Sequence, residues 1–119
     1  MQFGFNQGEV IEGATRVLCC AGQTSVDGDG NAQHPGDMAA QIALAADNLE
    51  EVLNQAGMSL SNVVRLNIYT TDVDALFANA GVLAERTGAA GVAPTSTLLG
   101  VARLEFPELM VELEATAVA

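Results

Sequence analysis

The chain has 119 residues, half of them apolar, and carries a formal net charge of −11 from 15 acidic and 4 basic residues. Its only cations are arginines scattered along the sequence, so it lacks the clustered positive charge that nucleic-acid or anionic-membrane binding requires. The length fits one domain, residues 1–119, with no linker or repeat.

The first half of the chain predicts two short strands, a loop and a long helix. Glu9 to Ile11 and Arg16 to Ala21 have strand patterns, and residues 27–36 form a polar loop rich in Gly and Asp. A helix is expected from about Asp37 to Ala56, with Asp37 as N-cap and Gly57 as its end. Its acids, Asp47, Glu50 and Glu51, are expected on a solvated face. The apolar residues recur at helical spacing and predict a buried stripe: Met38, Ile42, Ala45, Leu49, Val52, Leu53 and Ala56.

The second half predicts a strand, a helix and a closing hairpin. Ser61 to Thr70 has a strand pattern, and Asp74 to Thr87 a helical one, opened by Asp72 or Asp74. After Pro94, two alternating apolar segments between Thr95 and Val118 flank a kink at residues 105–107, which favours a strand, a turn and a second strand.

The last strand carries two carboxylates on one face. Side chains of a strand alternate between its faces, so Glu112, Glu114 and Thr116 point away from Val111, Leu113, Ala115 and Ala117. The face that holds the two glutamates is therefore either exposed to solvent or part of a functional site. Without further information we favour a wet face, or ion pairs with Arg103 or Arg16, because charged side chains are usually exposed.

The order of elements predicts an α+β fold in which two helices cover one face of a single sheet. Half of the residues are apolar, which is more than one small core can bury, so we expect a homo-oligomer. No run of 18 apolar residues predicts a membrane span, and the first ten residues lack the features of a signal peptide, so we predict a cytoplasmic protein.

No pattern predicts a metal or nucleotide site. Residues 27–31 imitate the start of a calcium loop, but Ala32 and Met38 stand where that loop needs glycine and glutamate, so a turn is expected. His34 is expected to be an exposed loop residue. The neighbouring Cys19 and Cys20 would face opposite sides of a strand, and we expect two buried, reduced thiols.

Five pieces of the sequence, in order, resemble the RidA/YjgF family, whose members include enamine/imine deaminases. The pieces are AGQ at 21–23, the Asp-rich turn at 27–31, the helix at 39–57, NVVRLNIY at 62–69, and GVARL followed by VELEATAV at 100–118. The resemblance implies a chorismate-mutase-like fold with a six-stranded mixed sheet. It also implies a homotrimer with sites in the clefts between subunits, small-molecule substrates and no cofactor.

The resemblance also gives Glu112 a role. This residue aligns with the glutamate that family deaminases use to position and activate a water molecule. A carboxylate in a partly buried cleft suits the task, because its raised pKa lets it exchange protons near neutral pH. Phe5 and Gly22 would line the same cleft.

The sequence departs from the family at the substrate anchor. Deaminating members have an arginine that grips the substrate carboxylate, and Ser96 stands in its place here. Arg103 is expected on the opposite face of the strand, which leaves Arg65 or Arg16, from another strand or subunit, as the candidate cations for the cleft.

Three functions follow from these observations. The first is RidA-like hydrolysis of a small enamine or imine whose class is altered by the loss of the arginine. The second is a trimer that binds a small metabolite without turnover, and the third is a protective or interaction role of the trimer surface. Some relatives have been described as ribonucleases, but the acidic composition argues against that activity here.

Overall fold

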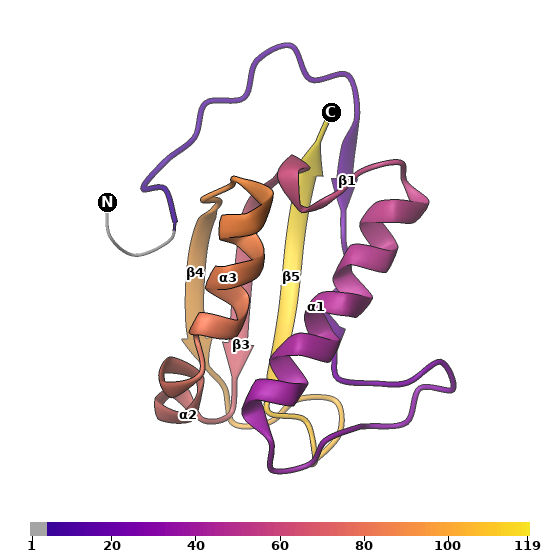
Figure 1. Cartoon of the computed structure of the whole chain (residues 1–119), viewed down its shortest axis with the longest axis vertical. Helices are drawn as coiled ribbons and strands as arrows, with labels where there is room; N and C mark the ends of the chain where they lie inside the picture. The colour runs from indigo at the N-terminus through magenta and orange to yellow at the C-terminus, as the bar shows by residue number, and fades with distance from the viewer. Residues whose placement is uncertain (1–4) are drawn as a thin grey trace.

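A computed structural model of the chain describes residues 5–119 and has one sheet with all of its helices on one face (Figure 1). In the sheet, β5 lies next to β1 and β2 on one side and next to β3 on the other, and β4 follows β3 at the far edge. The strands are β1 (Val17–Cys19), β2 (Gln23–Thr24), β3 (Val63–Thr70), β4 (Thr95–Gly100) and β5 (Val111–Val118). The helices are α1 (Met38–Gln55), α2 (Val73–Ala78) and α3 (Gly81–Ala90), with a 3-10 turn at Leu60–Asn62.

The sheet is mixed, as expected for this α+β fold, but the closing hairpin prediction is wrong. Strand β4 pairs with β3 in parallel, whereas β5 pairs with β3 antiparallel on its other edge. Strand β3 therefore separates the two strands that the sequence predicted to pair. The helical crossover between β3 and β4 makes these two strands parallel neighbours, and the loop after β4 carries the chain to the other side of β3, where β5 pairs.

Five strands are found among residues 5–119, instead of the six predicted. Residues 9–11 form no strand, and Val10 and Ile11 are exposed in an extended segment that runs past the end of the sheet (Figure 1). Before this segment, Asn6 makes a single parallel bridge to Thr95 of β4. The predicted strand at residues 16–21 is shorter, since the chain leaves the ladder after Cys19 and rejoins it as β2.

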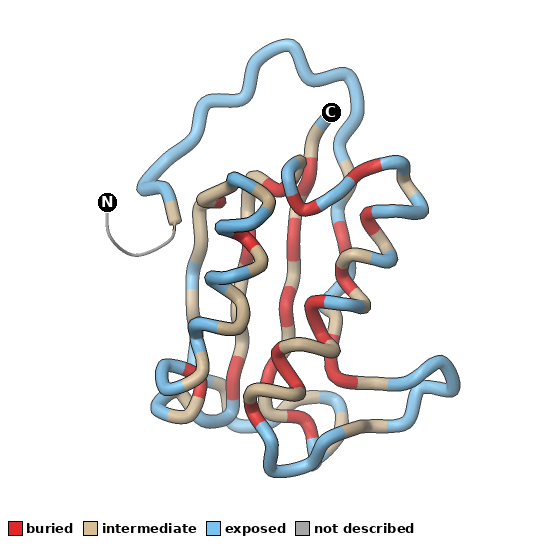
Figure 2. The backbone as a smooth tube through the Cα atoms, in the orientation of Figure 1, coloured by how far each residue is buried: buried red, intermediate tan, exposed pale blue. Residues whose placement is uncertain are grey.

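Helix α1 agrees closely with its prediction. Asp37 caps it by accepting a hydrogen bond from the backbone N–H of Ala40 at 3.1 Å, and Gly57, at a φ of +73°, follows its end. The predicted apolar stripe faces the sheet and is buried or partly buried along its length. Figure 2 shows buried segments along both α1 and β5.

The predicted second helix is divided into α2 and α3. Asp72 caps α2 by accepting a hydrogen bond from the N–H of Ala75 at 3.0 Å, which decides between the two cap candidates. Asn79 ends this helix, and its side-chain amide donates back to the carbonyl of Ala75 at 2.8 Å. This local bond competes with the backbone ladder and explains why a single helix from Asp74 to Thr87 does not form.

Gln41 of α1 anchors the loop that leads into β5. Its side chain is fully buried, and its amide nitrogen donates to the carbonyls of Gln33, His34 and Glu108 at 2.7–3.3 Å. Its side-chain oxygen accepts from the N–H of Met110 at 2.8 Å. The buried amide thus satisfies backbone groups from two loops at once and fixes the start of β5.

Three smaller predictions have mixed outcomes. Residues 27–31 form a turn, in which the Asp27 carboxylate accepts from the N–H groups of Asp29 and Asn31, both at 2.9 Å. His34 is exposed, as predicted. The prediction of two buried thiols is wrong for Cys19, which is exposed, while Cys20 is buried in the core. Strand β1 is at the edge of the sheet and its outward face is uncovered, which leaves Cys19 in solvent.

Candidate functional site

The two glutamates of β5 lie on the face of the sheet that carries no helix. Along β5 the residues alternate between buried and half-buried, and Glu112 and Glu114 belong to the half-buried set. In the register of β3 and β5, Glu112 lies opposite Tyr69 and Glu114 lies opposite Asn67. The uncovered face, which we call the open face, is therefore polar at its centre.

The Glu114 carboxylate is held by two neighbours on β3. The side-chain amide of Asn67 and the hydroxyl of Tyr69 both donate to Glu114 Oε1 at 2.9 Å. These hydrogen bonds favour the ionised form and lower the pKa of Glu114. The same bond to Glu114 is the main cause of a raised pKa at Tyr69. Glu114 is thus a fixed, charged group at neutral pH.

The Glu112 carboxylate is in a different environment and packs against the backbone of Gly22. A Cβ atom placed on Gly22 would lie 2.9 Å from Glu112 Cγ and 2.5 Å from Cδ, and closer still to Oε2. Only a glycine leaves room for this carboxylate. Burial raises the pKa of Glu112, and the negative charges of Glu114 and Glu105 raise it further.

The two carboxylates are therefore separated in acidity although they are two residues apart on one strand. The pKa of Glu112 is shifted toward neutral pH, whereas that of Glu114 is shifted away from it. Pairs whose environments push their pKa values apart are typical of acid–base sites. Between the two, Glu112 is the group suited to exchanging a proton.

Arg65 brings a cation to the open face. It precedes Asn67 and Tyr69 on the same side of β3, and its guanidinium donates to the hydroxyl of Thr97 on β4. Arg16 instead donates to the carbonyl of Ala56 at 2.6 Å. Arg103 lies in the loop beyond β4, so the strand offset used to place it on the opposite face does not apply. The side-chain oxygen of Asn67 is buried and has no hydrogen-bond partner within residues 5–119.

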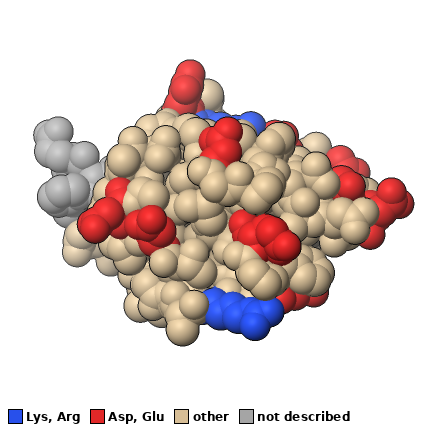
Figure 3. All heavy atoms as spheres, turned by 90° about the horizontal axis from the view of Figure 1, so that it is seen from below, with Lys and Arg blue, Asp and Glu red and all other residues tan. Residues whose placement is uncertain are grey.

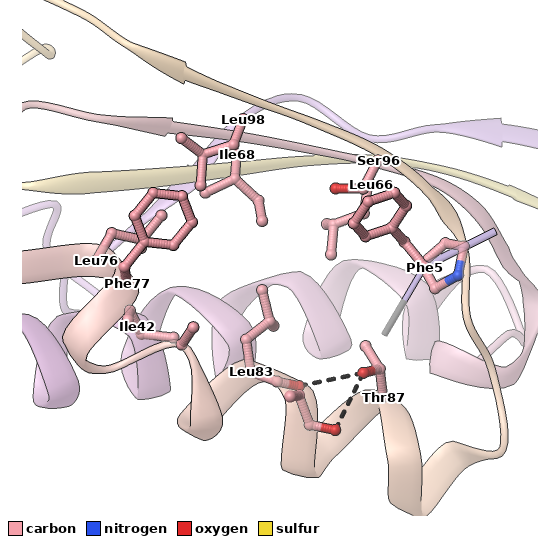
Figure 4. Close-up of a pocket in the computed structure, with 13 residues that line it drawn as sticks. Phe5, Ile42, Leu66, Ile68, Leu76, Phe77, Leu83, Thr87, Ser96 and Leu98 are labelled. Carbon is pink, nitrogen blue, oxygen red and sulfur yellow. Dashed lines mark hydrogen bonds between the residues drawn. The ribbon is translucent and has the colours of Figure 1, made fainter. Parts of the chain in front are cut away.

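Ser96 and Phe5 lie on the other face of the sheet, in a pocket between β4 and the helices α2 and α3 (Figure 4). The pocket has a volume of about 330 Å³. Ser96 lies beside Leu66 in the register of β3 and β4, and both side chains line the pocket. The other lining residues are Ile42, Ile68, Leu76, Phe77, Ala80, Leu83, Ala84, Thr87, Pro94 and Leu98.

One protomer does not bring the four predicted site residues together. Gly22 and Glu112 touch each other, and Phe5 and Ser96 share the pocket. The sheet separates these two pairs, because Glu112 points to the open face and Ser96 to the helical face. A ligand bound to one protomer alone can reach only one of the pairs.

Sequence reasoning missed the two neighbours that lower the pKa of Glu114. Asn67 and Tyr69 are two residues apart on β3, so they share the open face. That spacing is visible in the sequence. The pairing with Glu114 was not, because it depends on β3 and β5 being adjacent in a particular register.

Within residues 5–119, no group of three or more histidine, cysteine or acidic side chains is arranged to hold a metal ion. None of the helices in this part of the chain is both long and apolar enough to cross a membrane. Figure 3 shows one face of the molecule, on which acidic side chains are spread widely and basic side chains are few.

Comparison with known proteins places these features in a family. The family model described as Endoribonuclease L-PSP matches residues 3–119. A solved structure of the Rid family protein YyfB from Yersinia pestis, of unknown function, is 35% identical with a TM-score of 0.77 and aligns over 89% of this chain and 80% of its own.

Two further proteins extend the comparison. The structure of Escherichia coli TdcF with bound serine is 25% identical, with a TM-score of 0.78 and coverage of 92% of this chain and 84% of its own. The mitochondrial protein mmf2 of Schizosaccharomyces pombe is 45% identical over 58 residues, which are 49% of this chain. The match spans only 44% of the yeast protein.

Proposed function

This chain belongs to the Endoribonuclease L-PSP family, which includes the Rid/YjgF proteins, and from that premise we propose that it hydrolyses a small enamine or imine. The observation that carries the proposal is the environment of Glu112. Its carboxylate is packed against Gly22, and its pKa is raised by burial. A carboxyl group with a raised pKa can both accept and return a proton near neutral pH.

The reaction needs one such group. Glu112 takes a proton from water as the water oxygen bonds to the carbon of the C=N group. It returns that proton to the nitrogen, which gives a carbinolamine, and then carries the proton of the carbinolamine hydroxyl to the nitrogen as the C–N bond breaks and the C=O bond forms. The products are a carbonyl compound and ammonia, so one water is consumed and no electrons are exchanged. Glu114 stays ionised in its hydrogen bonds to Asn67 and Tyr69, and its charge supports the raised pKa of Glu112.

The complete site is proposed to lie between two protomers. The resemblance implies a homotrimer with clefts between subunits, and such a cleft would join Glu112 and Gly22 of one protomer to Ser96 and Phe5 of the next. The division of these residues between the two faces of the sheet supports the proposal, since neither pair forms a complete site by itself. The open face, which carries no helix (Figure 1), would then be covered by neighbouring subunits.

The substrate class is proposed to differ from that of relatives with the arginine. Ser96 offers a hydroxyl where those relatives have a guanidinium, and a carboxylate substrate would lose a charge-assisted contact worth roughly 1.5–3 kcal/mol. Within one protomer the sheet separates Arg65 from Ser96, and on the neighbouring protomer Arg65 shares the open face with Glu112, where its guanidinium donates to Thr97. We therefore propose a substrate without a carboxylate.

Two negative proposals accompany this one. RNA cleavage, which the family description names, is not proposed, because the net charge of −11 would repel a polyanion. The cytoplasm stays our predicted compartment, although the fission yeast relative is described as mitochondrial.

The test is ammonia release from a freshly generated neutral ketimine and from 2-aminoacrylate, each corrected for spontaneous hydrolysis. We expect the protein to hydrolyse the neutral imine, and we expect Glu112→Gln to lower the rate of hydrolysis by at least about 100-fold. Circular dichroism checks that the variant is folded. Full activity of Glu112→Gln would remove the proposed role of Glu112, and turnover of 2-aminoacrylate as fast as the ketimine would refute the change of substrate class.

A second function is supported by the pocket itself. A metabolite could bind beside Ser96 without being hydrolysed, because the pocket is lined almost entirely by apolar side chains. Absence of turnover together with ligand-dependent thermal stabilisation would favour this binding function.

A further inference from the structure

The pocket beside Ser96 has a composition that restricts what can bind there. None of the described residues that line it has an ionisable side chain, and only Ser96 and Thr87 carry a polar side-chain group. The Thr87 hydroxyl already donates to the carbonyls of Leu83 and Ala84, at 3.4 and 3.2 Å. The Ser96 hydroxyl has no hydrogen-bond partner within residues 5–119. The Ser96 hydroxyl is therefore the one side-chain group among the described lining residues that is free to form a hydrogen bond with a ligand.

The two ends of the pocket differ. Figure 4 shows Ser96 and Phe5 at one end, and Leu76 and Phe77 at the other, with Leu83 of α3 between them. A ligand that spans the pocket would thus place one polar atom near Ser96 and only carbon near the far end. The volume of about 330 Å³ is at the lower limit of ligand pockets, which suits a branched aliphatic chain or a single aromatic ring.

A charged ligand does not fit this pocket. Moving a carboxylate from water into apolar surroundings is costly unless a cation or several donors replace the water, and the residues of the same protomer that line the pocket offer neither. A neutral imine or carbonyl group needs only one donor, which the Ser96 hydroxyl can supply. The two phenyl rings of Phe5 and Phe77 can pack against a flat or branched hydrocarbon.

We propose that the substrate is an uncharged imine with a branched aliphatic or aromatic side chain, whose C=N end lies at Ser96 and whose hydrocarbon lies between β4 and α3. This inference rests on the proposed hydrolytic function, which it deepens by naming the substrate class. The C=N carbon at Ser96 is then the part of the ligand that a Glu112 carboxylate from a neighbouring protomer must reach.

Binding of unreactive analogues tests the inference without requiring turnover. Isovaleramide and phenylacetamide are neutral and carry the expected hydrocarbons, whereas isovalerate and phenylacetate have the same carbon skeletons with a charged end. We expect calorimetry to show that each amide binds at least about tenfold more tightly than its carboxylate partner. Equal or tighter binding of the carboxylates would overturn the proposal.

Substitutions in α3 locate the binding. Ala84 is exposed and lines the pocket, so Ala84→Leu should fill its mouth and abolish amide binding. Ala89 is also exposed on the same helix but does not line the pocket, so Ala89→Leu is the matched control and should bind normally. Ser96→Ala should weaken amide binding about three- to tenfold through loss of one hydrogen bond. Amide binding that survives Ala84→Leu would place the ligand elsewhere and refute the inference.

The two proposals fail in distinguishable ways. If the amides bind and Ala84→Leu prevents it, but no imine is hydrolysed, the pocket assignment stands and the hydrolytic function fails. If 2-aminoacrylate is hydrolysed in a Glu112-dependent reaction and neither amide binds, the hydrolytic function stands and the assignment of an uncharged, hydrocarbon-bearing substrate fails.

Discussion

The two faces of the sheet have opposite chemistry although the same strands build both. On the helical face, Leu66 and Leu113 join the core, and Ser96 lines an apolar pocket. On the open face, Glu112 and Glu114 lie beside the polar side chains of β3. Period-two alternation alone produces this division. The lesson is that strand sequences can specify an apolar pocket and a pair of carboxylates at once, but they place the two on opposite faces of the sheet.

The largest difference between the faces should appear in stability. Leu113 is fully buried under the helices, so Leu113→Ala should lower the free energy of unfolding by about 2–5 kcal/mol. Thr116 lies on the open face of the same strand, and Thr116→Ala should cost less than about 0.5 kcal/mol in an isolated protomer. Urea denaturation measures both. A cost above about 1 kcal/mol for Thr116→Ala would show that the open face is itself packed, which would sharpen the case for a subunit interface.

A second substitution separates function from stability on the open face. Gly22→Ala forces the Glu112 side chain to move, because the added Cβ would overlap its carboxylate. The carboxylate end can swing aside, so we expect little change in melting temperature but a loss of about 100-fold in imine hydrolysis. Gly81→Ala is the control, since a Cβ there meets nothing within 4 Å. Unchanged hydrolysis in Gly22→Ala would mean that the position of Glu112 is unimportant.

The smallest effects should come from the pH dependence of the two glutamates. The folded pKa of Glu112 is raised, so the folded state loses stability as pH rises from the unfolded value of about 4.3 through the folded value. The folded pKa of Glu114 is lowered, so its stabilisation is present above about 4.3 and is lost as pH falls through the folded value. The two carboxylates therefore contribute with opposite signs at neutral pH.

Two variants measure these contributions. At pH 7, Glu112→Gln should be more stable than the parent protein and Glu114→Gln less stable, each by no more than about 1 kcal/mol because the groups are partly exposed. Both differences should shrink as the pH falls below 4. Thermal unfolding from pH 3 to 8 provides the curves, and shifts of the same sign in both variants would contradict the assigned environments.

The sequence predicted features that depend on residues close in the chain better than it predicted which distant segments lie side by side in the fold. The cap at Asp37, the buried stripe of α1 and the alternation of β5 depend on residues close in the chain, and all three are confirmed. The pairing of β4 with β5 was predicted wrongly, because a short turn between alternating strands favours a hairpin unless a third strand lies between them. The role of Gln41 was not predicted either, because the hydrogen bonds of its buried side chain join segments that are far apart in the sequence.

The candidate site shows the same limit. Glu112, Gly22, Ser96 and Phe5 were named from the resemblance; the first two are in contact with each other, and the last two line one pocket. Strand alternation could have placed Ser96 and Glu112 on opposite faces, but only once β4, β3 and β5 were set side by side in register. Whether a second protomer joins the two pairs depends on assembly, which no local pattern encodes.

Hybrid oligomers test the shared cleft most directly. Glu112→Gln and Ala84→Leu are each expected to be inactive, one in proton transfer and the other in substrate binding. Co-expression with two different tags allows oligomers that contain both variants to be isolated. If each cleft combines the pocket of one protomer with Glu112 of the next, a mixed trimer regains one intact cleft, and hydrolysis should return to about one third of the parent rate. Hybrids as inactive as the two single variants, or a protein that is monomeric in solution, would contradict the account.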